Sequence, residues 1–251
     1  MEPRITLVAA TAMEMRAVLQ GLGMNKAAPE PGAAVTGVIR DIPVRLVTSG
    51  VGPLAAAYTA GRLAGEGCFT ADRCRGLLSL GIAGTYAANA APVGSVVMAT
   101  REIWPEYGLF TEEGVDAEAL GFPLAGKKGD SGAVWNSLTL SPAAALATMG
   151  LKDPATAPRS GENPVVAAGP SITVAAVSGT RTRARELAAR HAALIENMES
   201  FPLALAAAQA GVPFAEVRSV SNLVGDRSPE AWNIPASLAA LARAVGLMFS
   251  L

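Results

Sequence analysis

Short, almost entirely apolar runs that alternate with stretches of helical periodicity constrain the fold of this chain most strongly. Residues 5–10 and 77–80 are such runs, and this pattern is expected for strands whose two faces are both covered. Between them, apolar residues recur at helical spacing at Met15, Val18 and Leu22. The alternation predicts one α/β domain over residues 1–251, with a mixed central β-sheet flanked by helices.

The same patterns predict the remaining elements. A hairpin is expected over 35–48, with its turn at 41–43, and the strand at 77–80 is expected to end in a turn at the glycine-containing segment 81–85. Further strands are predicted over 93–100, 171–177, 193–197 and 213–220. Helices are predicted over 53–64, 142–149, 181–191 and 199–210 and from Pro235, a favoured first-turn residue. Residues 101–164 are otherwise expected to form long loops.

Composition excludes several functional classes. The 20 basic residues are balanced by 21 acidic ones, whereas a nucleic-acid platform would show clustered Lys and Arg. The arginine-rich stretch 181–185 fits the solvated face of a helix. No apolar run reaches the roughly 20 residues that a membrane span needs. Residues 4–12 imitate a signal peptide, but Glu14 and Arg16 follow at once, so a buried strand fits better. We therefore expect a soluble, cytoplasmic protein that binds neither nucleic acid nor membrane.

The cysteine and histidine counts argue against metal and disulfide chemistry. Cys68 and Cys74 are the only cysteines. Their spacing indicates neither a disulfide framework nor a zinc site, and it agrees with a reducing compartment. His191 is the only histidine, and its neighbours are typical of an exposed helix end. We expect no metal and no cofactor.

Polar residues stand at the predicted carboxyl ends of the strands, where open α/β sheets bind their ligands. They are Glu14, Ser49 with Gly50, the segment 81–85, Glu199 and Asn222. Polar groups at the ends of buried elements are costly unless they are paired or used. Each also has a structural explanation: Glu14 and Glu199 suit helix starts, Asn222 suits a turn, and the glycines suit tight turns.

Taken together, these segments resemble the purine nucleoside phosphorylase and nucleosidase superfamily, and within it the futalosine hydrolases of a menaquinone pathway. The resemblance rests on residues 12–14, 49–52, 81–84, 196–199 and 218–222, on the continuation 223–227 and on Trp232. It implies a nucleoside phosphorylase-like fold, a homo-oligomer and a small-molecule nucleoside substrate. The implied reaction is hydrolysis of the N-glycosidic bond of futalosine, which releases hypoxanthine.

The resemblance also implies roles for individual residues. Glu14 would deprotonate the attacking water, Glu199 would hold the ribose hydroxyls and favour the developing cation, and Asn222 would contact the purine. Arg218 would pair with a carboxylate and help to hold the water. The residues expected to bind substrate are Ser49, Gly50, Gly81, Ile82, Ala83, Gly84, Val177, Asn197, Met198, Arg218 and Ser221.

Three alternatives stay open. The first is an adenine-releasing nucleosidase, which acts on aminofutalosine or on methylthioadenosine and S-adenosylhomocysteine. Such nucleosidases carry Asp where this chain has Asn222. A carboxamide cannot act as an acid, but its NH₂ can donate a hydrogen bond to N7 or to a 6-oxo group of the purine. Phosphorylases carry an arginine just before the central glycine motif, whereas residues 78–80 read Leu-Ser-Leu and Arg75 lies further back. A non-catalytic nucleoside-binding domain is the third. Arg227, Trp232 and residues 101–164 are candidates for contacting the end of the substrate beyond the ribose.

Overall fold

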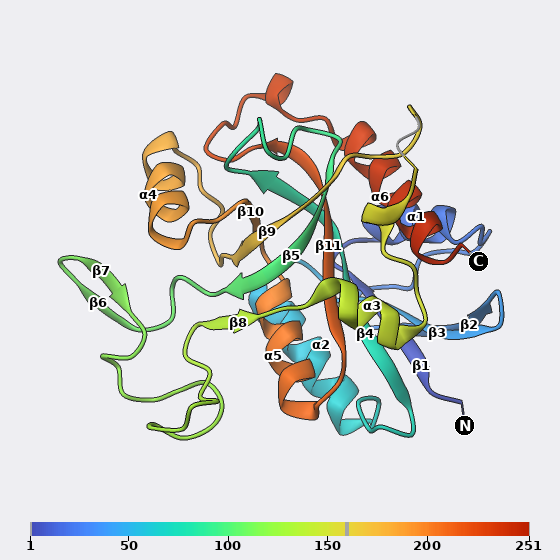
Figure 1. Cartoon of the computed structure of the whole chain (residues 1–251), viewed down its shortest axis with the longest axis horizontal. Coiled ribbons are helices and arrows are strands. Elements are labelled where there is room, and N and C mark those ends of the chain that lie inside the picture. Colours follow the sequence, from blue (N-terminus) through green and yellow to red (C-terminus); the bar gives the residue numbers. More distant parts are fainter. Residues whose placement is uncertain (1, 159–160, 251) are drawn as a thin grey trace.

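The chain forms a long mixed β-sheet with helices on both faces (Figure 1). The computed structural model describes residues 2–158 and 161–250. Along the sheet, the strands follow the order β10 (Ile195–Asn197), β9 (Val166–Thr173), β5 (Val96–Ile103), β11 (Phe214–Leu223), β4 (Cys74–Thr85), β1 (Arg4–Ala9), β3 (Ile42–Thr48) and β2 (Ala34–Ile39). A short strand, β8 (Ser137–Thr139), pairs with β5. The predicted α/β class and mixed sheet are confirmed.

Half of the sheet closes on itself. β4 pairs with β11, β11 with β5, β5 with β9 and β9 with β10. β10 then returns to β4 in antiparallel register, with Ile195 opposite Thr85 and Glu196 opposite Gly84. This ring brings the carboxyl ends of β4, β10 and β11 together, although they lie far apart in the sequence.

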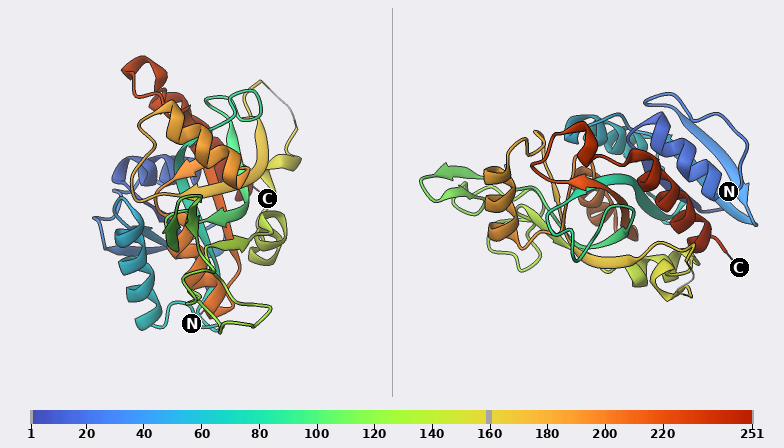
Figure 2. Two further views of the ribbon diagram at one scale, coloured as in Figure 1. Left: turned by 90° about the vertical axis from the view of Figure 1, so that its left-hand side faces the viewer. Right: turned by 90° about the horizontal axis from the view of Figure 1, so that it is seen from above.

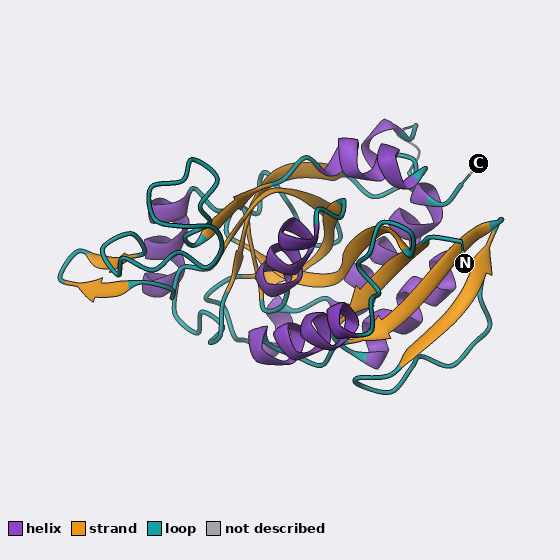
Figure 3. Ribbon diagram, turned by 90° about the horizontal axis from the view of Figure 1, so that it is seen from below, coloured by secondary structure: helices purple, strands orange, loops and turns teal. Residues whose placement is uncertain are grey.

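The helices cover the two faces separately (Figure 3). On one face α1 (Ala12–Gly21) packs against α6 (Ile234–Met248), beside α3 (Pro142–Met149). On the other, α2 (Pro53–Gly65) packs against α5 (Ser200–Ala210). α4 (Arg181–His191) lies at the periphery (Figure 1), and short 3-10 helices occupy Pro154–Thr156 and Pro229–Ala231.

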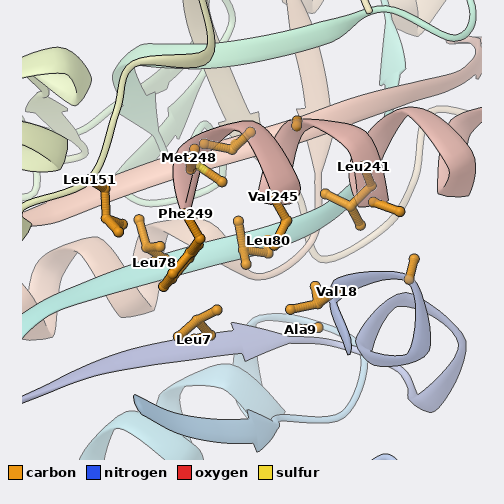
Figure 4. Close-up of a cluster of buried hydrophobic side chains, with 14 of the residues drawn as sticks. Leu7, Ala9, Val18, Leu78, Leu80, Leu151, Leu241, Val245, Met248 and Phe249 are labelled. Atoms are coloured by element: carbon orange, nitrogen blue, oxygen red, sulfur yellow. The ribbon is translucent and has the colours of Figure 1, made fainter. Parts of the chain in front are cut away.

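Side-chain alternation along the strands supplies both hydrophobic layers. On β1, Leu7 points toward the α1 and α6 layer and Val8 toward the α2 and α5 layer, because successive strand residues face opposite sides. Figure 4 shows Leu80 beside Val245 of α6, and Leu7 of β1 below Phe249, within the first layer. The central strands are therefore buried on both faces, which explains why their sequences are almost wholly apolar.

Residues 101–164 contain more regular structure than the sequence predicts. Besides β8 and the correctly predicted α3, they include a hairpin of β6 (Leu109–Thr111) and β7 (Gly114–Asp116). This hairpin extends away from the main sheet (Figure 2). Arg190 of α4 donates to the carbonyl oxygen of Val115 at 3.1 Å, which ties the hairpin to the rest of the fold.

Several predicted boundaries are wrong. Residues 81–85 continue β4 instead of forming a turn, because they pair with β11 from Arg218 to Leu223. A strand is predicted over 171–177, but β9 begins at Val166 and ends at Thr173. Pro170 interrupts the sequence pattern of this strand, because proline is unusual inside a sheet. The ladder accommodates Pro170 at a register shift in β5. The first hairpin turns at Arg40 and Asp41, whose φ angles are 45° and 66°, and not at 41–43.

Within residues 2–158 and 161–250, no helix combines the length and hydropathy that a bilayer crossing requires.

Candidate active site

A cavity of about 210 Å³ opens where the carboxyl ends of β1, β4, β10 and β11 converge. Its walls are largely apolar, and its polar groups come from segments that are distant in sequence. The lining residues are Ala10, Thr11, Met13, Glu14, Val51, Ile82, Ala83, Gly84, Val177, Ser178, Glu196, Asn197, Met198, Glu199, Ser221, Asn222, Val224, Arg227 and Trp232. An apolar cleft with a few converging polar groups is the usual form of a small-molecule site.

Glu14 serves as a helix cap and also reaches the cavity. Its Oε2 accepts hydrogen bonds from the backbone N of Thr11 at 2.9 Å and from the Thr11 hydroxyl at 2.7 Å. The Thr11 hydroxyl in turn accepts from the backbone N of Glu14 at 3.2 Å, which completes a capping box. Oε1 accepts from the backbone N of Ile82 at 3.0 Å. These bonds fix the carboxylate on both oxygens, so the capping explanation and a place beside the ligand are compatible.

Glu199 lines the same cavity and is held by a backbone amide and a guanidinium. Its Oε1 accepts from the backbone N of Gly52 at 3.0 Å, and its Oε2 lies 3.5 Å from Nη1 of Arg218. Burial raises the pKa of the Glu199 carboxyl, while Arg218 opposes that rise. Glu199 does not cap α5 with its side chain. Asn197 does so instead, because its Oδ1 accepts from the backbone N of Glu199 at 2.8 Å and from that of Ser200 at 2.9 Å.

Arg218 lies behind the cavity wall and is only 1% exposed. Its Nη2 donates to Ser200 Oγ at 2.8 Å and to Ser79 Oγ at 3.1 Å, and its Nε lies 3.3 Å from Oε1 of Glu216. Buried guanidinium groups need such partners. Arg218 therefore pairs with carboxylates, as the resemblance implies, and Glu199 connects it to the cavity. That it helps to hold the water stays a prediction.

Gly81 makes room for the two charged groups. A Cβ at this position would lie 2.4 Å from Arg218 Nη1 and 2.6 Å from Glu14 Oε1. Gly81 is a strand residue without a positive φ, so it is needed for space and not for an unusual backbone conformation. At Gly81 it is these two side chains that come close to the backbone, and a role of Gly81 in substrate binding stays a prediction.

Asn222 presents its carboxamide in a defined orientation. Oδ1 accepts from the Ser221 hydroxyl at 2.9 Å, and Nδ2 donates to the carbonyl oxygen of Leu223 at 3.0 Å. Because that carbonyl can only accept, the nitrogen must face it. The second Nδ2–H stays available to a ligand in the cavity. Gly84 stands opposite, where a Cβ would lie 3.3 Å from Nδ2.

The sequence predicts no role for Glu196, and the structure makes it a third carboxylate of the cavity. It accepts from the backbone N and the hydroxyl of Ser178 at 2.8 and 2.6 Å, and from the Tyr86 hydroxyl at 2.6 Å. Burial, and then the charge of Glu196, raises the pKa of Tyr86. Tyr86 and Ser178 carried no sequence signal, because neither belongs to a recognisable motif.

Most of the predicted site residues meet at this cavity. Those that line it are Glu14, Ile82, Ala83, Gly84, Val177, Asn197, Met198, Glu199, Ser221 and Asn222. Ser49, Gly50, Gly81 and Arg218 lie outside the lining; Ser49 donates to the carbonyl oxygen of its neighbour Gly50 at 2.9 Å. Ser49 and Gly50 stay predictions as substrate-binding residues.

Two residues at the exposed edge of the cavity were candidates for the far end of the substrate. The guanidinium carbon of Arg227 lies 4.9 Å from the ring centroid of Trp232, a cation–π contact. His191 is not part of the lining. It is the last residue of α4, as predicted, but it is half-buried and not exposed, and burial lowers its pKa.

Comparison with known proteins places the chain in a family. Residues 4–251 match the phosphorylase superfamily. A futalosine hydrolase of Streptomyces coelicolor is 36% identical over 203 residues, which cover 80% of this chain and 76% of that protein. A futalosine hydrolase of Thermus thermophilus is 35% identical over 173 residues, covering 67% and 66% of the two chains.

Solved structures agree at the level of the fold. A 5'-methylthioadenosine/S-adenosylhomocysteine nucleosidase of Helicobacter pylori superposes with a TM-score of 0.72 at 17% identity, covering 98% of this chain and 96% of that one. A futalosine hydrolase of Helicobacter pylori superposes with a TM-score of 0.70 at 18% identity, covering 97% and 94%. The match over nearly the whole chain, together with this shared fold, shows that the protein belongs to the phosphorylase superfamily.

Proposed function

We propose that this protein is a cytoplasmic futalosine hydrolase, which cleaves the N-glycosidic bond with water and releases hypoxanthine for menaquinone biosynthesis. The observation that carries the proposal is the placement of two buried carboxylates, Glu14 and Glu199, on one largely apolar cavity. The identity shared with the Streptomyces and Thermus futalosine hydrolases supports the choice of substrate. The two free cysteines agree with a reducing compartment.

The proposed reaction uses the carboxylates for different tasks. Water attacks C1 of the ribose, its oxygen forms the new bond, and the electron pair of the C–N bond leaves with the purine. Glu14 takes the proton of the water, a step that contributes about 10²–10⁴-fold. Glu199 holds the ribose hydroxyls and stabilises the positive charge that develops on the ring. Met198 and Val177 make part of the wall apolar, and apolar surroundings strengthen both electrostatic effects.

Asn222 contacts the purine in this proposal. Its available Nδ2–H suits a group that accepts a hydrogen bond, such as N7 or the 6-oxo oxygen of hypoxanthine. The leaving base then departs as a stabilised anion and takes up its proton afterwards. A 6-aminopurine offers an NH₂ donor at the same place, so it would meet the carboxamide less well.

Replacing Asn222 with aspartate should shift the preference from hypoxanthine toward adenine nucleosides. One hydrogen bond to a charged group is worth about 1.5–3 kcal/mol, so the ratio of kcat/KM values for aminofutalosine over futalosine should rise by roughly 10- to 100-fold. Asn233→Asp is the matched control, because Asn233 caps α6 from an exposed position by accepting from the backbone N of Ala236. Undisturbed selectivity in Asn222→Asp would contradict our account of base recognition.

The function is tested with purified protein, four nucleosides and chromatography of the released base. Futalosine, aminofutalosine, inosine and methylthioadenosine are each supplied with and without inorganic phosphate. The proposal expects hypoxanthine from futalosine at a rate that does not depend on phosphate. Adenine release as the main activity would favour the alternative nucleosidase, strict phosphate dependence would favour a phosphorylase, and binding without turnover would favour a sensing domain.

The surroundings of Gly81 favour water over phosphate. Arg75, the nearest arginine before it in the sequence, lies at the start of β4, with its guanidinium beside Gly150. Arg218 is held by Glu199, Glu216 and two serines, although its Nη1 makes no hydrogen bond within the described residues. Neither Arg75 nor Arg218 belongs to the cavity lining beside Glu14.

We also propose that the protein is a homo-oligomer that associates through the start of α2. Val51, Leu54 and Tyr58 are 59%, 85% and 71% exposed and form an apolar stripe there. Exposed stripes of this kind mark association surfaces. Leu54→Asp should lower the molar mass measured by light scattering toward that of a monomer. Val165→Asp, at an apolar residue that is 62% exposed but lies outside this stripe, should leave the mass unchanged. A monomeric wild type would contradict the proposal.

A further inference from the structure

Two carboxyl side chains that the proposed reaction does not use lie behind Arg218. Glu102 of β5 and Glu216 of β11 are both completely buried. Among the described residues, Arg218 is the cation within ion-pair distance of this pair, through Glu216. The same guanidinium also serves Glu199. Burying an uncompensated charge costs several kcal/mol, so two ionised carboxylates here would leave one of them without a counter-ion.

In each of these two carboxyl groups, one oxygen accepts hydrogen bonds and the other accepts none among the described residues. Oε1 of Glu216 accepts from the Ser171 hydroxyl at 3.0 Å and from Arg218 Nε at 3.3 Å. Oε1 of Glu102 accepts from the Thr173 hydroxyl and from Asn197 Nδ2, the latter at 3.3 Å. The Oε2 atom of each carboxyl is buried and has no hydrogen-bond partner in the described part of the chain. Glu102 lies within hydrogen-bonding reach of Glu216, so one proton would turn one of the two acceptors into a donor toward the other.

The electrostatics agree with this geometry. Burial, followed by the charge of Glu216, raises the pKa of Glu102 well above its ordinary value. The titratable and charged groups that face Arg218 are Glu199, Glu216, Glu14 and Glu102. The side chains that β9 and β10 contribute, Ser171, Thr173 and Asn197, are uncharged.

The pair is connected to Glu199 along two routes. One runs from Glu216 through Arg218 to the Glu199 carboxylate, and the other runs from Glu102 through Asn197 to the Glu199 backbone N. We propose that Glu102 and Glu216 share a single proton and act as positioning residues, so that the pair sets how much of the Arg218 charge reaches Glu199. The kinetic consequence rests on the proposed function, in which Glu199 must be ionised for turnover.

Three variants test this arrangement through the acid limb of the kcat/KM–pH profile. Glu102→Gln reproduces the protonated form, so the limb stays at its wild-type pH. Glu102→Ala removes the carboxyl that donates to Glu216, so the full negative charge of Glu216 acts on Arg218. Arg218 then attracts Glu199 less strongly and the pKa of Glu199 rises. The acid limb therefore moves to higher pH. Glu216→Gln removes the negative charge beside Arg218 while burial keeps Glu102 protonated, so Arg218 acts more strongly on Glu199 and the pKa of Glu199 falls. The limb then moves to lower pH by about one unit.

Opposite shifts from Glu102→Ala and Glu216→Gln, with rescue by Glu102→Gln, would support the positioning role. A shift in Glu102→Gln equal to that in Glu216→Gln would overturn it, because both carboxylates would then be ionised in the wild type. Three unchanged profiles would also overturn it, since they would leave only a packing role. If Glu102→Ala does not fold, the two glutamine variants still decide between these outcomes.

Infrared spectroscopy tests the shared proton without any substrate. The difference spectrum between wild type and Glu102→Gln at neutral pH, with ¹³C-glutamate labelling for assignment, should show the loss of one protonated-carboxyl C=O band. No such band would overturn the shared proton. Because this measurement needs no turnover, its result stands whether or not futalosine is the substrate.

Discussion

Glu14→Gln is expected to lower kcat by about 10²–10⁴-fold with little change in KM. A carboxamide cannot take a proton from the attacking water. The substitution removes an interaction made in the transition state and leaves the shape of the cavity nearly unchanged, so kcat falls and substrate binding does not. Steady-state kinetics with futalosine at saturating concentration measure the effect directly.

The structure predicts a smaller cost of the same substitution to stability. Both oxygens of Glu14 accept from backbone amides, Oε2 from Thr11 and Oε1 from Ile82. Glutamine keeps one acceptor and turns an NH₂ toward the other amide, which costs about 1–3 kcal/mol. The folded fraction is therefore measured by circular dichroism, and kcat is normalised to it. Glu186→Gln, on the exposed face of α4, serves as the surface control. A Glu14→Gln enzyme within about threefold of wild type would rule out the proposed base.

Arg218→Leu is expected to cost about 3–5 kcal/mol of unfolding free energy and most of the activity. Removing one partner of a buried ion pair leaves the other charge without compensation. Arg218 is 1% exposed and lies 3.3 Å from Glu216 and 3.5 Å from Glu199. Denaturant unfolding measures the first effect, and the kinetics of the folded protein measure the second.

The matched control is Arg243→Leu. Arg243 lies 3.5 Å from Glu162, but the two side chains are 49% and 80% exposed. Exposed pairs contribute about 0–1 kcal/mol, so this variant should unfold close to the wild type. Equal unfolding midpoints for Arg218→Leu and Arg243→Leu would contradict the structural role that we assign to Arg218.

The loss of unfolding free energy in Arg218→Leu should also depend on pH. Burial already raises the pKa of Glu199 in the folded protein, and Arg218 opposes that rise. Without Arg218, the folded-state pKa of Glu199 rises further above its unfolded value. The ionised form of Glu199 then destabilises the fold, so the penalty grows as pH rises from the unfolded pKa toward the folded one. Below the unfolded pKa the carboxyl is protonated in both states, and this part of the penalty disappears.

Much of the fold could be predicted from local sequence because its signals are local. The apolar run at the start of β1 and the helical spacing from Met15 to Leu22 depend on neighbouring residues, and both elements are found where they were expected. Glu14 and Asn222 stand at the ends of buried runs, and the structure brings both to the same cavity. A polar residue in such a place is conspicuous, because burial makes it costly unless it has a purpose.

Errors arise where a distant strand decided the local structure. Residues 81–85 contain two glycines and therefore predicted a turn, but the ladder with β11 holds them extended. The strand β9 was not predicted at its full length because Pro170 is unusual inside a strand. The register shift that accommodates Pro170 lies in β5 and cannot be read from the sequence of β9. Tyr86 and Ser178 gained their place only through Glu196, which β10 brings to them.

The sequence by itself determined the α/β alternation, the apolar strands and the identities of the polar groups at their ends, because burial and helical periodicity act over a few residues. Only the tertiary structure decided which of those groups meet. The closure of β10 onto β4 brings Glu196 beside Gly84, and Gly81 leaves the space in which Glu14 and Arg218 approach each other. Glu102 and Glu216 lie on the neighbouring strands β5 and β11, a placement that comes from the strand order of the whole sheet and not from any single segment.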